Sequence, residues 1–79
     1  MTESEIMAEL QRLNCTEIQV TVMASNPELT SFSFKDKQQV YSTADVLKLL
    51  KQIDGSDQSA PNDSVWYMIE KGMEMMQQP

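Results

Sequence analysis

The spacing of apolar residues changes from helical to alternating near the start of the chain. In residues 2–14, Ile6, Leu10 and Leu13 recur at intervals of four and three, which predicts one amphipathic helix. In residues 17–23, β-branched residues alternate with polar ones. Strict alternation of this kind is typical of a strand with one buried face.

Two further strands are expected after a turn that contains an Asn-Pro pair. Residues 29–35 resume the alternation and place both phenylalanines of the chain on one face. Asp36 and Lys37 predict a tight reversal into residues 38–41. That last segment is short and polar, which is typical of a strand at the edge of a sheet.

Two helices are expected to complete the fold. Residues 42–55 carry the clearest helical pattern, and their first residue is a serine suited to cap the helix. Gly55 is expected to end this helix through a left-handed cap. The polar residues 55–63 predict a loop, after which Asn62 or Asp63 caps the final helix. The apolar positions of that helix are Val65, Met68, Ile69, Met73 and Met76, with Gly72 on the same stripe.

These elements predict a single α+β domain that spans residues 1–79. One helix precedes a two- or three-stranded antiparallel sheet, and two helices follow it. Because one face of such a sheet must be shielded from water, we expect the helices to pack on one face.

The composition leaves little catalytic chemistry. The chain has no histidine, so neither a Ser-His-acid triad nor an imidazole base can form. Its two glycines, Gly55 and Gly72, are too few and too far apart for a glycine-rich phosphate loop. Cys15 is the only cysteine, and at the end of a helix the dipole disfavours a thiolate, so a small buried apolar residue is expected. We therefore expect no metal site, no cofactor and no enzymatic activity.

The net charge of −6 and the pI near 4.3 argue against direct binding to nucleic acid, which depends on lysine and arginine. The first residues lack the basic and apolar regions of a signal peptide, and no apolar run approaches the ~20 residues of a membrane span. A lone cysteine fits a reducing compartment. These observations predict a cytoplasmic protein without membrane contact.

The middle of the chain is the exception to this acidity. Lys35, Lys37, Lys48 and Lys51 lie in residues 35–53, whose formal charge is positive. They would form a basic patch if the hairpin tip approached the outer face of the helix that follows. Lysines opposite an apolar stripe are also typical of a solvated helix face.

The C-terminal helix carries the strongest functional signal. Four of the seven methionines lie in the last twelve residues, just after a Trp-Tyr pair. Methionine suits adaptable binding surfaces as well as irregular cores, and Trp and Tyr are enriched at interface hot spots. This helix is therefore expected to bind a protein partner or a second copy in a homodimer, with either Trp66 or Tyr67, together with Met75, partly exposed in the isolated subunit. The predicted contact residues are Trp66, Tyr67, Glu70, Met73 and Met75.

The leading hypothesis is a non-enzymatic, acidic protein–protein interaction module. In size, acidity and layout the chain is similar to many small proteins of phages and mobile elements, among them inhibitors of host nucleases, although the likeness rests on no motif. A second hypothesis is an acidic inhibitor or DNA mimic that blocks a nucleic-acid-binding host protein. It requires the carboxylates of the first and last helices to align. A third is a small ligand-binding or enzyme subunit. The carboxylates in question are Glu3, Glu5, Glu9, Glu70 and Glu74.

Overall fold

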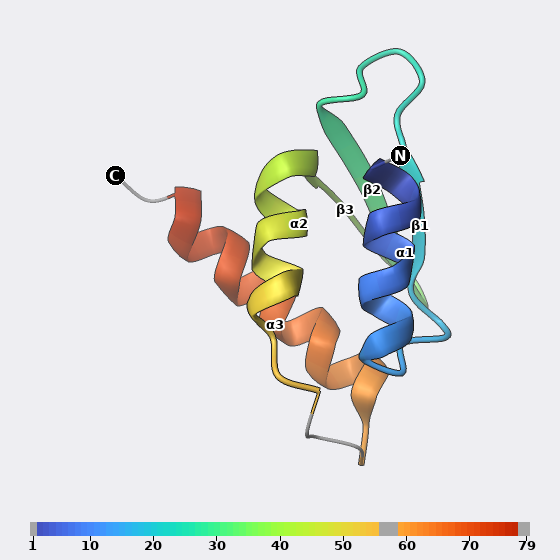
Figure 1. The fold of residues 1–79 in the computed structure, drawn as a ribbon, viewed down its shortest axis with the longest axis vertical. Helices are drawn as coiled ribbons and strands as arrows, with labels where there is room; N and C mark the ends of the chain where they lie inside the picture. Colours follow the sequence, from blue (N-terminus) through green and yellow to red (C-terminus); the bar gives the residue numbers. More distant parts are fainter. Residues whose placement is uncertain (1, 56–58, 78–79) are drawn as a thin grey trace.

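The computed structural model describes residues 2–55 and 59–77. It confirms the α+β fold and the expected order of one helix, a three-stranded antiparallel sheet and two helices (Figure 1). The third strand, the least strongly patterned of the three, is present. Residues 56–58 of the predicted loop lie outside the described residues. The elements are α1 (Thr2–Arg12), β1 (Gln19–Val22), β2 (Leu29–Phe34), β3 (Lys37–Ser42), α2 (Thr43–Gln52) and α3 (Pro61–Gln77).

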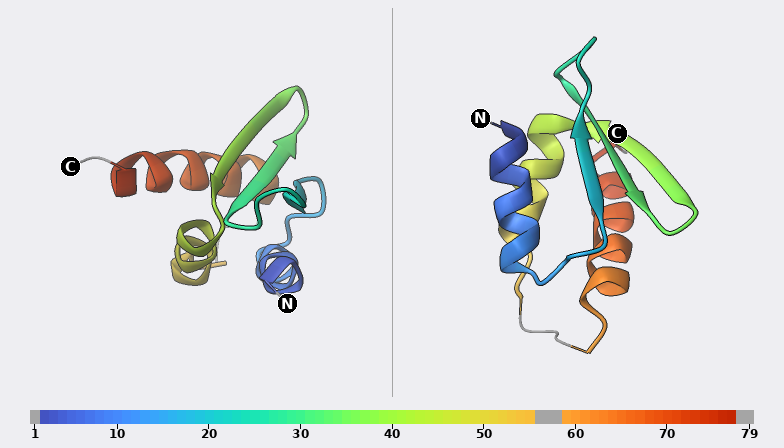
Figure 2. Two further views of the ribbon diagram at one scale, coloured as in Figure 1. Left: turned by 90° about the horizontal axis from the view of Figure 1, so that it is seen from above. Right: turned by 90° about the vertical axis from the view of Figure 1, so that its right-hand side faces the viewer.

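The sheet is a meander in which β1, β2 and β3 pair in chain order. Val20 lies opposite Phe32, and Thr30 lies opposite Tyr41. Because side chains alternate between the two faces, these four residues and Phe34 share one face. The three helices lie on that side of the sheet (Figure 2), so the predicted one-sided packing is confirmed.

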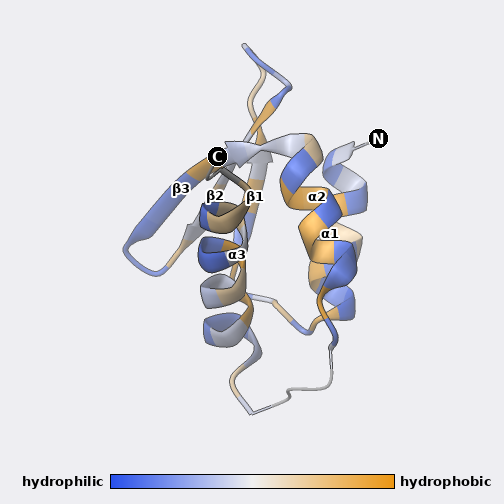
Figure 3. Ribbon diagram, turned by 90° about the vertical axis from the view of Figure 1, so that its left-hand side faces the viewer, coloured by the Kyte–Doolittle hydropathy of each residue, from blue (hydrophilic) through white to orange (hydrophobic). Residues whose placement is uncertain are grey.

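One hydrophobic core fills the space between the sheet and the helices. Hydrophobic and hydrophilic segments alternate along all three helices (Figure 3), as expected where each helix buries only one side. Thr30 and Thr43 are buried as well, and their hydroxyl oxygens lie 2.6 Å apart, which satisfies both groups. The largest core side chains are Trp66, Phe32, Ile6, Leu13, Leu50, Ile69 and Met73.

Helix α1 ends through a left-handed asparagine. Asn14 has a φ of 62°, its N–H donates to the Gln11 carbonyl, and the Cys15 N–H donates to the Leu10 carbonyl at 2.8 Å. These two bonds form a Schellman motif, in which carbonyls of the last helical turn find donors. Asparagine tolerates this conformation better than most residues, so the predicted helix end near Asn14 has a local cause.

Helix α2 ends by a different route from the predicted one. Ser42 caps its start as expected, since its hydroxyl accepts from the Asp45 N–H. At its end, the chain leaves the helix at Ile53 in an extended conformation, and Gly55 has no positive φ. The prediction of a left-handed cap at Gly55 was therefore wrong.

Arg12 supplies the donors that the end of α2 needs. Its two terminal nitrogens donate to the Leu50 carbonyl at 2.9 Å and to the Ile53 carbonyl at 3.1 Å, while its Nε donates to Glu9 at 2.8 Å. The guanidinium has five donors in a planar fork, which allows one side chain to bond all three acceptors. A positive group at a helix C-terminus also interacts favourably with the helix dipole.

Helix α3 begins one residue before the predicted cap. Pro61 occupies the first helical position, where its lack of an N–H has no consequence. Asn62 therefore lies inside the first turn, and its side chain bonds Glu17 twice: it accepts from the Glu17 N–H at 3.0 Å and donates to the Glu17 carboxylate at 3.1 Å. The start of α3 is thus attached to the segment before β1.

The β2–β3 turn falls at Lys35 and Asp36, one residue earlier than predicted. Phe34 pairs with Lys37, and Lys35 takes a positive φ of 56°. The Lys35 ammonium lies 3.3 Å from the Asp63 carboxylate and 5.0 Å from the Phe34 ring centre. The hairpin tip therefore reaches the first turn of α3.

Candidate interaction surfaces

The structure divides the five predicted contact residues of α3 between the core and the surface. Trp66 and Met73 are only 2% and 1% exposed, so they belong to the core of the subunit. Tyr67 is 60% exposed and Met75 is 74% exposed, whereas Glu70 is half-buried. The exposed pair is Tyr67 with Met75, and the burial of Trp66 and Met73 removes them from the accessible surface of the isolated subunit.

The exposed residues of α3 do not form one continuous patch. At about 100° per residue, Tyr67 and Met75 differ by about 80° around the helix and are separated by two turns. Met75 and Met76 are adjacent near the end of α3, and both are exposed. We call Met75 and Met76 the methionine end.

Met76 lies on the core-facing stripe of α3, but the rest of the fold does not cover it. It follows Ile69 and Met73 at helical spacing on the stripe that faces the core. Ile69 and Met73 are buried, but Met76 is 43% exposed. The last turns of α3 extend past α2 and away from the strands in Figure 1 and in the left view of Figure 2. The apolar stripe of the helix is therefore longer than the core that it packs against.

Trp66 anchors α3 on the sheet. Its ring lies 5.8 Å from the Phe34 ring, centre to centre, in a tilted arrangement. Its indole Nε1 is buried and has no hydrogen-bond partner among the described residues. Since Trp66 is covered within one subunit, its fluorescence reports on the core and not on an interface.

Gly72 allows α2 and α3 to approach closely. A Cβ built at this position would lie 2.6 Å from Cδ2 and 2.7 Å from Cδ1 of Leu49. Leu49 is partly buried and packs against the core. Here the neighbour is a side chain of the same chain.

The four lysines of the predicted basic patch do not gather on one surface. Lys35 is at the hairpin tip, where it pairs with Asp63, and Lys37 begins β3 beside it. Lys48 and Lys51 are exposed on α2. Both views of Figure 2 place α3 between the hairpin tip and α2. The two pairs of lysines therefore belong to separate parts of the surface.

The carboxylates of the first and last helices are likewise separated. Helix α2 lies between α1 and the last turns of α3 (Figures 1 and 2). In α1, one Glu3 oxygen accepts from the Val22 N–H at 2.9 Å, and Glu9 pairs with Arg12. Near the end of α3, Glu74 lies 3.7 Å from Lys71. Helix α2 therefore separates the backbone that carries the acidic residues of α1 from the last turns of α3.

Cys15 behaves as a buried apolar residue, as predicted. Its thiol lies 3.5 Å from the Pro61 carbonyl and 3.7 Å from the Leu13 carbonyl. Burial raises the pKa of the thiol to about 11, which keeps it protonated and unreactive near neutral pH. Within the described residues no three acidic or cysteine side chains are close enough to hold a metal ion. Nor does this part of the chain contain a helix that is long and apolar enough to cross a membrane.

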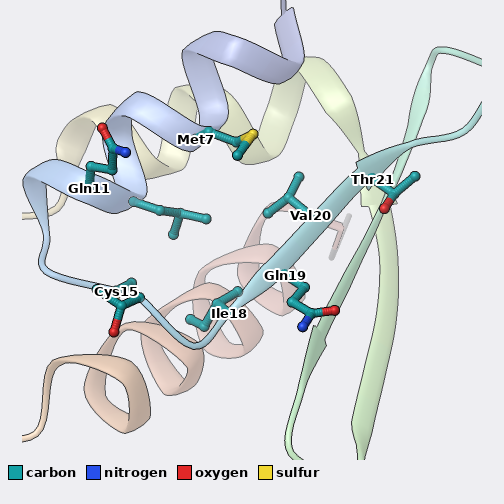
Figure 4. A pocket seen from close by; sticks show the side chains of 9 residues that line it. Met7, Gln11, Cys15, Ile18, Gln19, Val20 and Thr21 are labelled. Atoms are coloured by element: carbon teal, nitrogen blue, oxygen red, sulfur yellow. The ribbon is translucent and has the colours of Figure 1, made fainter.

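A groove between α1 and β1 is the surface that sequence reasoning missed. Its volume is about 500 Å³. Met7, Leu10 and Gln11 line it from α1, and Ile18 and Val20 line it from the strand side (Figure 4). The alternating pattern predicted the strand, but a pattern within one segment does not reveal which of its edges stays unpaired.

The chain matches no family model, no curated protein and no solved structure. No role can therefore be transferred to its residues from a relative. The two exposed apolar features, the methionine end and the α1–β1 groove, are the basis for a functional proposal.

Proposed function

We propose that this protein is a non-enzymatic interaction module whose methionine end inserts into an apolar groove of a different protein. The observation that carries this proposal is the burial along the core-facing stripe of α3. Ile69 and Met73 are buried, whereas Met76, the next residue of the stripe, is 43% exposed. A helix that continues an apolar stripe beyond its own core offers that stripe to another surface.

The chemistry of the exposed side chains supports this mode of binding. Met75 and Met76 are unbranched and polarizable, so they can fill grooves of irregular shape. They extend from a helix whose start is fixed in the core by Trp66. Because the helix is already formed, a partner would not have to supply the free energy of ordering it.

Charge favours a different protein over a second copy. Each chain has a net charge of −6, so two copies repel one another over the whole surface. Close to the methionine end, Glu70 and Glu74 outnumber the single cation Lys71. A groove with lysine or arginine at its rim would complement this part of α3.

The absence of histidine and the protonated state of the Cys15 thiol support a role without catalysis. The burial of Cys15 deprives the chain of its one strong nucleophile. A function in binding needs neither group.

The experiment is affinity capture with three forms of the protein, followed by titration of the purified partner. The wild type and Tyr67→Ser are expected to capture the same protein, because Tyr67 lies on another side of α3. The double variant Met75→Glu, Met76→Glu is expected to lose it, with affinity reduced at least about tenfold. All three should fold alike by circular dichroism.

Two results would refute the proposal. One is equal binding of the identified partner to the wild type and to the double variant. The other is a dimer in sedimentation that the same double substitution dissociates, which would make a second copy the occupant of this surface.

A further inference from the structure

The outer edge of β1 presents unpaired backbone groups. The Met23 N–H donates to the Leu29 carbonyl at 3.0 Å, which places the odd-numbered residues of β1 in hydrogen-bonded pairs with β2. The N–H and C=O groups of Val20 and Val22 therefore point away from the sheet. Glu3 accepts from the Val22 N–H, but within residues 2–55 and 59–77 no partner bonds the outward groups of Val20. Such an edge can pair with another strand.

The groove beside this edge is suited to the side chains of an added strand. Met7 and Val20 lie toward one another across it (Figure 4). Met7 is 51% exposed, and the buried side chains of Leu10 and Ile18 form part of the wall. An extended segment alongside β1 would direct alternate side chains toward this apolar surface, because successive residues of a strand point to opposite faces.

Charge indicates which kind of segment fits. The residues that line the groove carry no charge, but Glu3 precedes Met7 on the same side of α1, and Glu17 lies beside Ile18 at the other end. Glu3 is held by the Val22 N–H and Glu17 by Asn62, so both carboxylates keep their positions. The nearest cation of α1, Arg12, is occupied by Glu9 and the end of α2.

We propose that the groove between α1 and the outer edge of β1 binds an extended, basic segment of another protein, which adds a fourth strand to the sheet. The segment bonds the backbone of Val20, packs an apolar side chain against Met7 and Leu10, and directs lysine or arginine toward Glu3 and Glu17. A second copy of this chain is a poor occupant, because its own β1 would bring Glu3 and Glu17 against their like charges.

The second free edge of the sheet provides a matched control. Directly after β3, the Thr43 N–H donates to the Glu28 carbonyl, so by the same alternation the amide of Val40 in β3 points away from β2. Val40 lines neither the α1–β1 groove nor the pocket beside the start of α2. Proline at an outward-facing position removes one edge donor and leaves the ladder with β2 intact. Val20→Pro therefore tests the β1 edge, and Val40→Pro makes the same change at the β3 edge.

The experiment titrates the protein with a synthetic peptide that has alternating valine and threonine in its centre and two lysines at each end. The peptide is expected to bind with a Kd below about 1 mM and to shift the amide NMR signals of β1 and α1. Val20→Pro should weaken binding about tenfold, in line with the loss of one backbone hydrogen bond, and Val40→Pro should change it less than twofold. Replacing the four lysines by glutamates should weaken binding further.

The role of the two carboxylates is tested with Glu3→Gln and Glu17→Gln in one chain. An amide oxygen can still accept the Val22 N–H, so this variant removes charge and retains the hydrogen bond. It is expected to bind the lysine peptide several-fold more weakly and with less dependence on salt. Equal affinity for the lysine and glutamate peptides would refute the charge assignment.

Circular dichroism checks that Val20→Pro is folded. If it is not, peptides that carry N-methyl groups at alternate amides replace it, since they lack the N–H groups that would donate to the outward carbonyls of the β1 edge. The proposal is overturned if wild-type protein fails to bind the lysine peptide at millimolar concentration, if both proline variants bind alike, or if β1 instead mediates a dimer. The Met75→Glu, Met76→Glu variant should bind the peptide normally, so failure here and failure of the proposed function of α3 are distinguishable.

Discussion

The two ends of α3 are held in different ways. At its start, Asn62 bonds Glu17, Asp63 pairs with Lys35, and the Pro61 carbonyl lies 3.5 Å from the Cys15 thiol. Trp66 then fills the core. Near its end, the exposed Glu74 pairs with Lys71 within the helix itself. The first half of α3 is built into the fold, whereas Met75 and Met76 at its end are exposed.

The difference explains why methionine content alone is ambiguous. Met73 and Met75 are two residues apart and have the same chemistry, yet one is buried and the other is 74% exposed. Their environments differ because successive side chains of a helix point in different directions, and also because the core ends between the two residues. A methionine-rich helix can therefore contribute to the core at one end and to a binding surface at the other.

The largest expected contrast is between two neighbouring aromatic residues. Trp66→Ala removes a fully buried side chain and should lower the free energy of unfolding by about 3–5 kcal/mol. Tyr67→Ala removes an exposed ring and should change it by less than about 0.5 kcal/mol. Urea unfolding followed by circular dichroism measures both. Similar losses in the two variants would mean that α3 is not anchored at Trp66.

Gly72 lies at the boundary between the two halves of α3. The effect of substituting it on the free energy of unfolding should change sign when its neighbour Leu49 is also substituted. Gly72→Ala places a Cβ against Leu49, and this overpacking should lower the free energy of unfolding by about 1 kcal/mol despite the gain in helix propensity. In a Leu49→Ala background, Gly72→Ala should raise the free energy of unfolding by about 1 kcal/mol. The clash is then gone, and only the higher helix propensity of alanine contributes. The four variants form a double-mutant cycle. The same sign in both backgrounds would contradict the close approach of α2 and α3.

The smallest expected effect concerns the influence of Glu70, in α3, on Tyr41, in β3. Burial raises the pKa of Tyr41, and the carboxylate of Glu70 raises it further. Glu70→Gln should therefore lower the pKa of Tyr41, which stays above its ordinary value of 10.0 because burial remains. Tyrosinate absorbance measures this in a Tyr67→Phe background, which removes the other tyrosine. An unchanged titration would indicate that Glu70 lies away from Tyr41.

Glu74→Gln is the matched control, since Glu74 lies one turn nearer the free end and should leave the Tyr41 titration unchanged. The effect on stability has a fixed sign. Because the folded pKa of Tyr41 lies above the unfolded one, the folded state keeps its proton to higher pH. The stability linked to that proton is present below about pH 10 and is lost as the pH rises through the folded pKa.

Local patterns predicted most of the fold. The apolar spacing of Ile6, Leu10 and Leu13 gave α1, and the alternation around Phe32 and Phe34 gave the central strand. The errors lie at helix ends. Gly55 failed as a cap because Arg12 supplies the donors for α2 from another helix, and a contact over that separation in sequence leaves no local signal.

The surfaces were harder to predict than the fold. Periodicity placed Met73 and Met76 on one stripe but could not show that the core ends between them, because that depends on where α2 and the sheet lie. Trp66 is of a residue type enriched at interfaces, but the structure shows that it is a core residue. The groove at β1 had no local signal, since it arises where α1 and an unpaired strand edge meet.

The chain-order meander has a consequence for synthesis on the ribosome. Every strand partner has been synthesised once Ser42 is added, but Phe34 stays without its aromatic neighbour until Trp66 follows. At ~5–20 residues per second, the interval from Ser42 to Met73 lasts roughly 2–6 s. Until α3 has been made, the phenylalanine face of the sheet lacks the cover that Trp66 supplies in the folded protein.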